Sequence, residues 1–381
     1  MIFSARPHAL AGIAATAVLG ASGIAGLASP ASAHESGPPS RAVFVQTDDP
    51  TGNSVVAYDR ATDGTLSQAG TYTTGGLGGV LTGSVVDHLA SQGSLTLDES
   101  RHSLYAVNAG SDTVTVFGVD GDTLTRQAVV PSGGSFPVSV AVQGNLVYVL
   151  NARNGGSVQG FRRTGGGLVP IAGSNRPLGL DPTAAPEFVN TPGQVAFSPD
   201  GSRLVVTTKA NGSNVDVFAV TASGSLSASA TVTHLPGAVP FAVSWDDLGR
   251  LVLAEAGTNS VATFRLDAQG ALHAVDSAAT GQAATCWIVR SHDRFYASNA
   301  GSGSLSGYRV GLDGSLSALG TTATDAGTVD ATATRDGRFL YVQAGKAGQV
   351  DAYRVQQDGS LASLGSVTVP NAAGGEGIAA E

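Results

Sequence analysis

Three charged residues stand out in a polar position that recurs along the chain. Seven segments each end an apolar run with a polar residue, in the order Gln46, Asn108, Asn151, Thr208, Glu255, Asn299 and Gln343. Glu255 is the one acid among them, Lys209 lies one position later where most segments have Ala, and Arg153 lies two positions later where most have Gly. A carboxylate can activate water, and Arg or Lys can bind a carboxylate or phosphate group. These three residues are candidates for a general base and two anion-binding groups.

Other polar residues could complete such a site. Gln194 enters an apolar run, and His88 follows Asp87, so an Asp–His pair could orient a general base. A helix-capping or solvated role is an equally good interpretation of His88. The amides Asn108, Asn151 and Asn299 could bind a ligand, or each could cap the turn that follows its own strand. Chance placement of surface charges is the corresponding alternative for the charged residues.

Motifs for metals and cofactors are absent from the sequence. It has no P-loop, no G-x-S-x-G elbow and no histidine pair at zinc spacing. Oxygen ligands around Glu255 would suit calcium, but they would come from well-separated segments. Cys286 is the only cysteine, and it is better explained as a small residue in a buried strand than as a nucleophile. We expect no metal and no cofactor.

A repeat of about 45 residues must position these side chains. An aromatic residue is followed seven or eight positions later by Leu in the pairs Tyr58/Leu66, Phe117/Leu124, Phe161/Leu168, Phe218/Leu226, Phe264/Leu272, Tyr308/Leu316 and Tyr353/Leu361. Within residues 193–232, apolar runs alternate with P-D-G, polar and G-S turns, which is typical of four antiparallel strands. Seven such copies predict an all-β protein, a seven-bladed β-propeller with four antiparallel strands per blade.

The two ends of the chain predict how the ring closes. The first repeat begins at Ala42–Gln46, which matches a second strand, so blade 1 lacks its innermost strand. Residues 374–381, GGEGIAAE, match the start of an inner strand. We expect the C-terminal strand to complete blade 1, because a propeller must cover its open strand edges. Residues 42–381 then form a single propeller domain.

The alternation of strands also predicts which face carries function. Turns between the second and third strands, and links between blades, lie on one face. The two enlarged links, residues 73–93 and 174–193, both belong to this face. Enlarged loops on a rigid scaffold commonly carry function, so we expect ligands at this mouth of the central channel. His102 and His292 lie in turns of the opposite face.

The blade consensus resembles a known family. VAFSPDGSRLVVTTKANGSNVDVFAV and the closing GGEGIAAE are similar to the lactonase-type seven-bladed propellers, the family of 6-phosphogluconolactonase and 3-carboxymuconate cyclase. The resemblance covers residues 42–381 and implies a hydrolase that opens a small, anionic lactone at the channel mouth. Glu255 or His88 would be its base. The substrate-binding residues would be Arg153, Lys209, Gln194, Asn108, Asn151 and Asn299.

A second resemblance leaves an alternative open. Residues 104–119, LYAVNAGSDTVTVFGV, are similar to the YVTN-type repeat of surface propellers, a class that is not defined by catalysis. The alternative is a non-catalytic propeller that binds a ligand or a protein with the same face.

The N-terminus and the net charge indicate the compartment and the partners. Residues 1–33 read as a secretory signal peptide cleaved after Ala33, followed by a leader over residues 34–41. We therefore expect a secreted, extracellular protein with no membrane insertion. A net charge of −9 argues against nucleic acid and anionic membranes. We expect a monomer whose partner is a small-molecule lactone or another anionic ligand.

Overall fold

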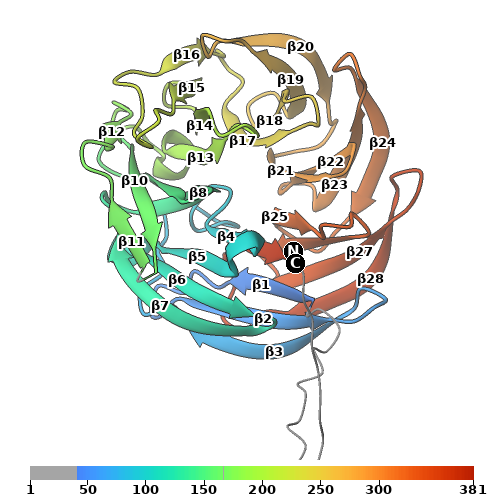
Figure 1. Ribbon diagram of the computed structural model, residues 1–381. Coiled ribbons are helices and arrows are strands. Elements are labelled where there is room, and N and C mark those ends of the chain that lie inside the picture. The colour runs from blue at the N-terminus through green and yellow to red at the C-terminus, as the bar shows by residue number, and fades with distance from the viewer. Residues whose placement is uncertain (1–40, 166) are drawn as a thin grey trace, which may run out of the picture. The chain divides into compact units, whose positions relative to one another are not determined.

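Seven β-sheets form a closed ring around a central channel in the computed structural model, which describes residues 41–165 and 167–381 (Figure 1). Every sheet has four antiparallel strands in the predicted order, and the sheet of blade 3 gains a fifth, short strand. The seven-bladed propeller predicted from the repeat is confirmed. The predicted signal peptide and the leader up to residue 40 lie outside the described residues. In the described part of the chain, no helix is long and apolar enough to cross a membrane.

In the first three blades, the strands follow one another from the channel outward. Blade 1 contains β29 (Ile378–Ala380), β1 (Ala42–Gln46), β2 (Ser54–Arg60) and β3 (Leu66–Thr73). Blade 2 contains β4 (Leu95–Asp98), β5 (Ser103–Asn108), β6 (Thr113–Asp120) and β7 (Thr123–Pro131), with the 3-10 turns Glu99–Arg101 and Ala109–Ser111. Blade 3 contains β8 (Pro137–Gln143), β9 (Leu146–Asn151), β10 (Ser157–Thr164), β11 (Gly167–Pro170) and the short β12 (Arg176–Pro177).

The other four blades follow the same order. Blade 4, preceded by helix α1 (Glu187–Asn190), contains β13 (Pro192–Phe197), β14 (Arg203–Thr208), β15 (Asn214–Ala219) and β16 (Thr231–His234). Blade 5 contains β17 (Pro240–Trp245), β18 (Leu251–Glu255), β19 (Ser260–Leu266) and β20 (Leu272–Ala279). Blade 6 contains β21 (Thr285–Ser291), β22 (Arg294–Asn299), β23 (Ser304–Val310) and β24 (Leu316–Ala323). Blade 7 contains β25 (Thr328–Ala333), β26 (Phe339–Ala344), β27 (Gln349–Val355) and β28 (Leu361–Thr368).

The C-terminal strand closes the ring, as predicted. β29 pairs antiparallel with β1, so that Ala380 lies opposite Val43 and Ile378 opposite Val45. The N–H of Gln46 extends the ladder by donating to the carbonyl oxygen of Gly377 over 2.8 Å. The two ends of the described chain therefore share one sheet (Figure 1).

The hydrophobic core lies between neighbouring blades. Successive side chains of a strand point to opposite faces of its sheet. On β14, Leu204 and Val206 therefore pack into a cluster with Tyr148 of blade 3, whereas Val205 packs with Leu253 of blade 5. Both faces of each blade are buried in this way, which explains the continuous apolar runs of the second strands.

Turns between the third and fourth strands, several of them D-G turns, join a blade to the one before it. In the turn at Asp313, the carboxylate accepts the N–H and hydroxyl of Ser315, and Gly314 adopts a positive φ of 96°. The Gly314 carbonyl accepts the Thr263 hydroxyl of blade 5 at 2.7 Å. The equivalent carbonyls of other blades accept a tyrosine hydroxyl from the preceding blade: Gly64 from Tyr341, Gly224 from Tyr148 and Gly359 from Tyr296.

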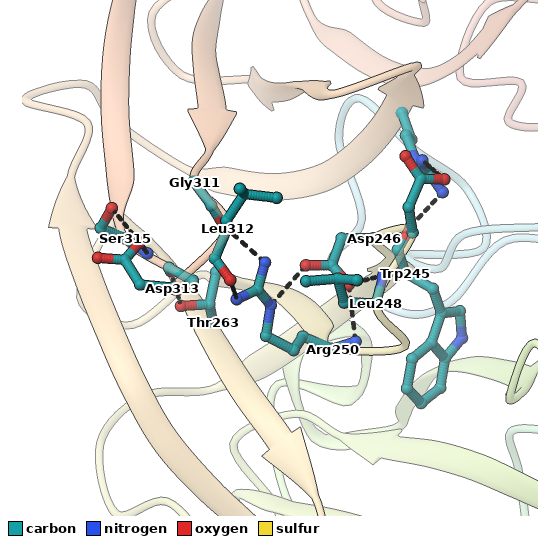
Figure 2. A network of polar contacts seen from close by, with 12 residues as sticks. Trp245, Asp246, Leu248, Arg250, Thr263, Gly311, Leu312, Asp313 and Ser315 are labelled. Carbon is teal, nitrogen blue, oxygen red and sulfur yellow. Dashed lines mark hydrogen bonds and ion pairs between the residues drawn. The ribbon is translucent and has the colours of Figure 1, made fainter.

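Arg250 strengthens one of these joints (Figure 2). Its Nε donates to Asp246 at 2.6 Å, and its terminal nitrogens donate to the carbonyls of Leu312 at 2.8 Å and Gly311 at 2.6 Å. The buried guanidinium thus connects the first turn of blade 5 with the D-G turn of blade 6. These contacts lie on the face opposite the enlarged links, which leaves the link-bearing face to carry a site.

Candidate functional site

The end of the first enlarged link, residues 84–93, lies inside the channel against the inner strands, and we call it the plug. Its Gln92 side chain accepts the N–H of Ile288 and donates to the Ile288 carbonyl, at 2.9 and 3.0 Å. The plug backbone also bonds to inner strands of two more blades, through Gly93 to Val140 and through Gln92 to Gly193. Because these bonds occupy the open edges of the inner strands, the plug is held rigidly in the channel.

A pocket of about 160 Å³ lies at the mouth of the channel, between the plug and blades 4 to 6. Aromatic side chains of Phe188, Phe241 and Trp287 form much of its wall, with Val and Ala side chains between them. The loops that contribute are links between blades and turns after second strands. The pocket therefore lies on the face where the sequence predicts ligand binding.

Lys209 lines this pocket from the turn after β14. Its side chain is 1% exposed, and Nζ donates to the carbonyl oxygens of Ala90 and Phe188, both at 2.5 Å. Burial lowers the pKa of Lys209 to about 7, although Asp87 acts in the opposite direction. A charged and an uncharged amine are therefore both accessible near neutral pH.

Asp87 of the plug lines the same pocket. One carboxylate oxygen accepts the N–H of Leu89 at 2.8 Å, and the other accepts the N–H of Ser91 at 3.0 Å. Burial raises the pKa of Asp87 to about 6, with the backbone bonds and Lys209 opposing this rise. Lys209 and Asp87 are two titratable groups at one pocket. Their pKa values lie closer together than those of an ordinary lysine and aspartate.

Cys286 of β21 also lines the pocket. Burial raises the pKa of its thiol to about 12, so the nucleophilic thiolate is not populated at neutral pH. This agrees with its interpretation as a small residue in a strand.

Arg153, predicted to bind an anion, has a partner within the protein. Its guanidinium binds Glu187 at 2.7 and 3.2 Å and stacks on Phe136, with 4.2 Å between the guanidinium carbon and the ring centre. Glu187 also accepts the N–H of Thr82, so the ion pair joins the two enlarged links. The bond to Arg153 lowers the pKa of Glu187 to about 2. Arg153 supports helix α1 beside the pocket but does not line it.

The two predicted bases lie outside the pocket lining. Glu255 is 8% exposed and accepts the hydroxyl of Ser260 at 2.7 Å, within its own blade, and burial raises its pKa. His88 lies against Gly374, where an added Cβ would be 2.1 Å from the imidazole. Its Nδ1 is buried without a partner, and burial lowers the pKa of His88.

The predicted amide ligands are bonded mostly within the scaffold. Asn108 donates to Thr113 and Thr115 of its own blade, and Asn299 donates in the same way to Ser304 and Ser306. The side chain of Asn151 is buried with neither polar atom partnered. Gln194 accepts the N–H of Val243 at 2.6 Å, which joins blades 4 and 5. Of the predicted site residues, Lys209 alone lines the pocket.

Buried carboxylates lie below the pocket, around the plug. Glu376 accepts the N–H of Gly93 at 3.1 Å, and its own N–H donates to Asp48 at 2.7 Å. Burial raises the pKa of Asp48 to about 8, that of Asp330 to about 7 and that of Glu376 well above its usual value. Across the residues that the structure describes, no three His, Cys, Asp or Glu side chains are grouped to hold a metal ion.

Sequence reasoning missed the Asp87 carboxylate and the aromatic residues as parts of the pocket wall. Phe188 comes from the second enlarged link and Asp87 from the first, so the pocket joins segments about 100 residues apart. The signal that could have found them is the presence of large apolar residues in links that are otherwise polar and rich in glycine.

A seven-bladed ring with a small pocket at one mouth of its channel is a scaffold suited to binding or converting a small molecule. The family model for the lactonase, 7-bladed β-propeller, matches residues 51–174 and 255–377, well over half of the chain. The protein belongs to this lactonase family.

Solved structures share the fold across almost the whole chain. A protein from Lactobacillus plantarum is 22% identical, with a TM-score of 0.73 over 90% of this chain and 99% of that one. A putative 6-phosphogluconolactonase from Bacteroides fragilis is 17% identical, with a TM-score of 0.71 over 91% and 99%. The periplasmic gluconolactonase of Pseudomonas aeruginosa is 18% identical, with a TM-score of 0.69 over 89% and 98%. None of the curated proteins matches this chain.

Proposed function

We propose that the protein is an exported hydrolase that opens a small lactone in the pocket at the channel mouth. Family membership supports the reaction class, and the names of two similar structures point to lactones as substrates. The observation that carries the choice of site is the presence of Lys209 and Asp87 in the lining of one apolar pocket.

Lys209 would bind the lactone carbonyl. An ammonium group has three N–H donors, and the carbonyls of Ala90 and Phe188 take two of them. The third can donate to the carbonyl oxygen and then to the oxyanion that forms when water attacks. A donor held in place in an apolar, water-poor pocket stabilises such a charge more strongly than it would in water.

Asp87 would be the general base. Each of its oxygens accepts one backbone N–H, and an ionised carboxylate can accept about four hydrogen bonds in all. A water bound at the remaining positions would give its proton to Asp87 as its oxygen attacks the carbonyl carbon. The ester C–O bond of the ring then breaks, and the proton passes to the ring oxygen that leaves.

The residues that line the pocket also indicate which substituents the lactone carries. Among the residues that the structure describes, Lys209 is the only cationic side chain that lines the pocket, and Arg153 is paired with Glu187. We therefore propose a lactone whose substituents are apolar. The expected anionic lactone would have to place its charge at Lys209, so a carboxylated lactone of the same ring size is the informative comparison.

A pH-stat assay over aliphatic, sugar and aromatic lactones tests this function. Lys209→Met should lower kcat about 100- to 1,000-fold, the usual effect of removing an oxyanion donor. Asp87→Asn should lower it as well. Glu255→Gln and His88→Ala test the bases predicted from the sequence and should retain turnover if Asp87 is the base. Full turnover in Lys209→Met, on a protein with an unchanged melting curve, would contradict this site.

The predominantly apolar lining favours one alternative, a propeller that binds a small apolar ligand without converting it. Trp287 lines the pocket, so its fluorescence should report binding. Binding without turnover across the whole panel would support the alternative.

Export is part of the proposal and has its own test. Expression of the full-length chain should place the mature protein outside the cell with His34 as its first residue. A secreted protein that retains residues 1–33, or one that stays in the cell, would contradict it.

A further inference from the structure

The Lys209 amine could carry out a second kind of chemistry. The chain has only two lysines, Lys209 and Lys346. Lys346 is exposed in the turn after β26, whereas Lys209 is almost completely covered and meets a pocket. The same chain therefore contains a buried amine in an apolar site and an ordinary surface amine for comparison.

The hydrogen bonds of Lys209 orient this amine. A neutral amine has two N–H groups and one lone pair in a tetrahedral arrangement. The carbonyls of Ala90 and Phe188 accept two N–H bonds from Nζ, so in the neutral form both hydrogens are engaged. The lone pair then remains free to attack an electrophile.

The size and wall of the pocket select that electrophile. An apolar cavity of about 150 Å³ can hold one benzene molecule. The pocket beside Lys209 has about 160 Å³ and is walled by Phe188 and by Phe241 and Trp287, whose ring centres are 4.9 Å apart. Because Lys209 is 1% exposed and lines this pocket, we expect a reagent to reach it through the pocket. Small apolar molecules should therefore be favoured over charged ones.

We propose that Lys209 forms a Schiff base with small apolar aldehydes that enter the pocket. This activity goes beyond lactone hydrolysis and does not rest on it.

The atoms and charges of this step balance with groups that line the pocket. The amine nitrogen bonds to the carbonyl carbon, and the carbonyl oxygen takes one proton from the nitrogen. Protonated Asp87 supplies a second proton, directly or through one water, and the oxygen leaves as water. The nitrogen keeps one hydrogen in the resulting iminium cation, and the Asp87 carboxylate compensates its charge.

The charge state of Lys209 supports this reaction. Burial lowers its pKa to about 7, while Asp87 and, more weakly, Cys286 raise it. A large share of the amine is therefore unprotonated near neutral pH, whereas an ordinary lysine is almost entirely protonated there. Lysines desolvated in apolar pockets are activated in this way for attack on carbonyl groups.

Reductive trapping tests the proposal. The protein is incubated at pH 7.5 with benzaldehyde and cyanoborohydride, and its peptides are analysed by mass spectrometry. We expect one benzyl group on Lys209, formed at least ten times faster than on Lys346. Glyoxylate, a charged aldehyde, should not label Lys209 faster than Lys346. In urea-unfolded protein the two lysines should react alike.

Two variants keep the test independent of folding defects. Lys209→Arg should remove the fast labelling. Ala256→Leu leaves Lys209 in place but fills the pocket, and it should slow labelling of Lys209 at least ten-fold with an unchanged melting curve. Labelling of Lys346 at the same rate as Lys209 in the folded protein would overturn the proposal. So would fast labelling of Lys209 in folded Ala256→Leu.

Discussion

Lys209 and Arg153 come from equivalent turns of adjacent blades, but their surroundings give them different roles. Lys209 is covered by backbone carbonyls and an apolar wall, so its charge is costly and its amine can titrate. Arg153 is 38% exposed and forms an ion pair with Glu187. The buried side chain is therefore the better candidate for chemistry, and the exposed one for holding the links together.

Arg153→Ala tests this structural role. The lost ion pair and the lost stacking on Phe136 should lower the free energy of unfolding by about 1 kcal/mol, measured by urea denaturation. Proteolysis within residues 174–193 should become faster, because helix α1 loses its tie to the first link. Arg335→Ala is the control, since its ion pair with Glu99 is 84% exposed on the Arg side. Equal effects of the two variants would contradict the role given to Arg153.

At the scale of elements, the turns between third and fourth strands and the C-terminal strand have the same role, because both join neighbouring strands or blades. The D-G turns of blades 1, 6 and 7 each present a glycine carbonyl to a hydroxyl of the blade before it. At the ring closure, β29 also supplies a ladder of backbone bonds to β1. Blade 1 therefore depends on residues from both ends of the chain.

Deletion of residues 374–381 should lower the melting temperature sharply. The deletion exposes the edge of β1 and removes Glu376 from the plug. Circular dichroism and differential scanning calorimetry would measure the loss. Glu376→Gln retains the strand, so we expect it to lower the melting temperature less than the deletion does. The difference between the two variants separates the effect of the strand from that of the carboxylate. A deletion variant that melts with the full-length protein would rule out the closing role of β29.

At the scale of the whole molecule, carboxylates concentrate in the middle of the ring. Asp48, Asp330 and Glu376 have raised pKa values because burial disfavours their charged forms. In the unfolded chain these groups lose their protons near pH 4. Between that pH and their folded pKa values, the folded state binds more protons than the unfolded state, so stability falls as the pH rises.

The melting temperature should therefore be higher at pH 5 than at pH 8. The loss should develop between about pH 4 and pH 8, the window set by the usual carboxyl pKa and by that of Asp48. Below about pH 4 the turn aspartates such as Asp313, whose pKa hydrogen bonds lower, add an opposite trend. Asp48→Asn should flatten the profile above pH 5. A melting temperature that rises steadily from pH 5 to pH 8 would contradict this origin.

The fold could be predicted because the same four-strand pattern recurs seven times in the sequence. The D-G turns, the aromatic–Leu spacing and the second-strand valines each recur, so errors in one copy are corrected by the others. The pocket occurs once and is built from links that do not repeat. Lys209 was found because it replaces the alanine that most blades have at the equivalent position. Phe188 and Asp87 lie in links that have no equivalent in the other blades. Arg153 breaks the pattern as well, but its partner Glu187 could be recognised only in three dimensions.

The bond between Glu376 and the plug has a consequence for the order in which the protein can mature. The plug is synthesised early, but the carboxylate that accepts its Gly93 N–H lies 283 residues later, and the strand that covers β1 follows that carboxylate. A nascent chain that stops before residue 374 lacks both, even with every blade's outer strands already made. No product truncated before residue 374 should therefore contain a finished pocket, and the proposed activity should first appear once residues 374–381 have been synthesised and folded into place.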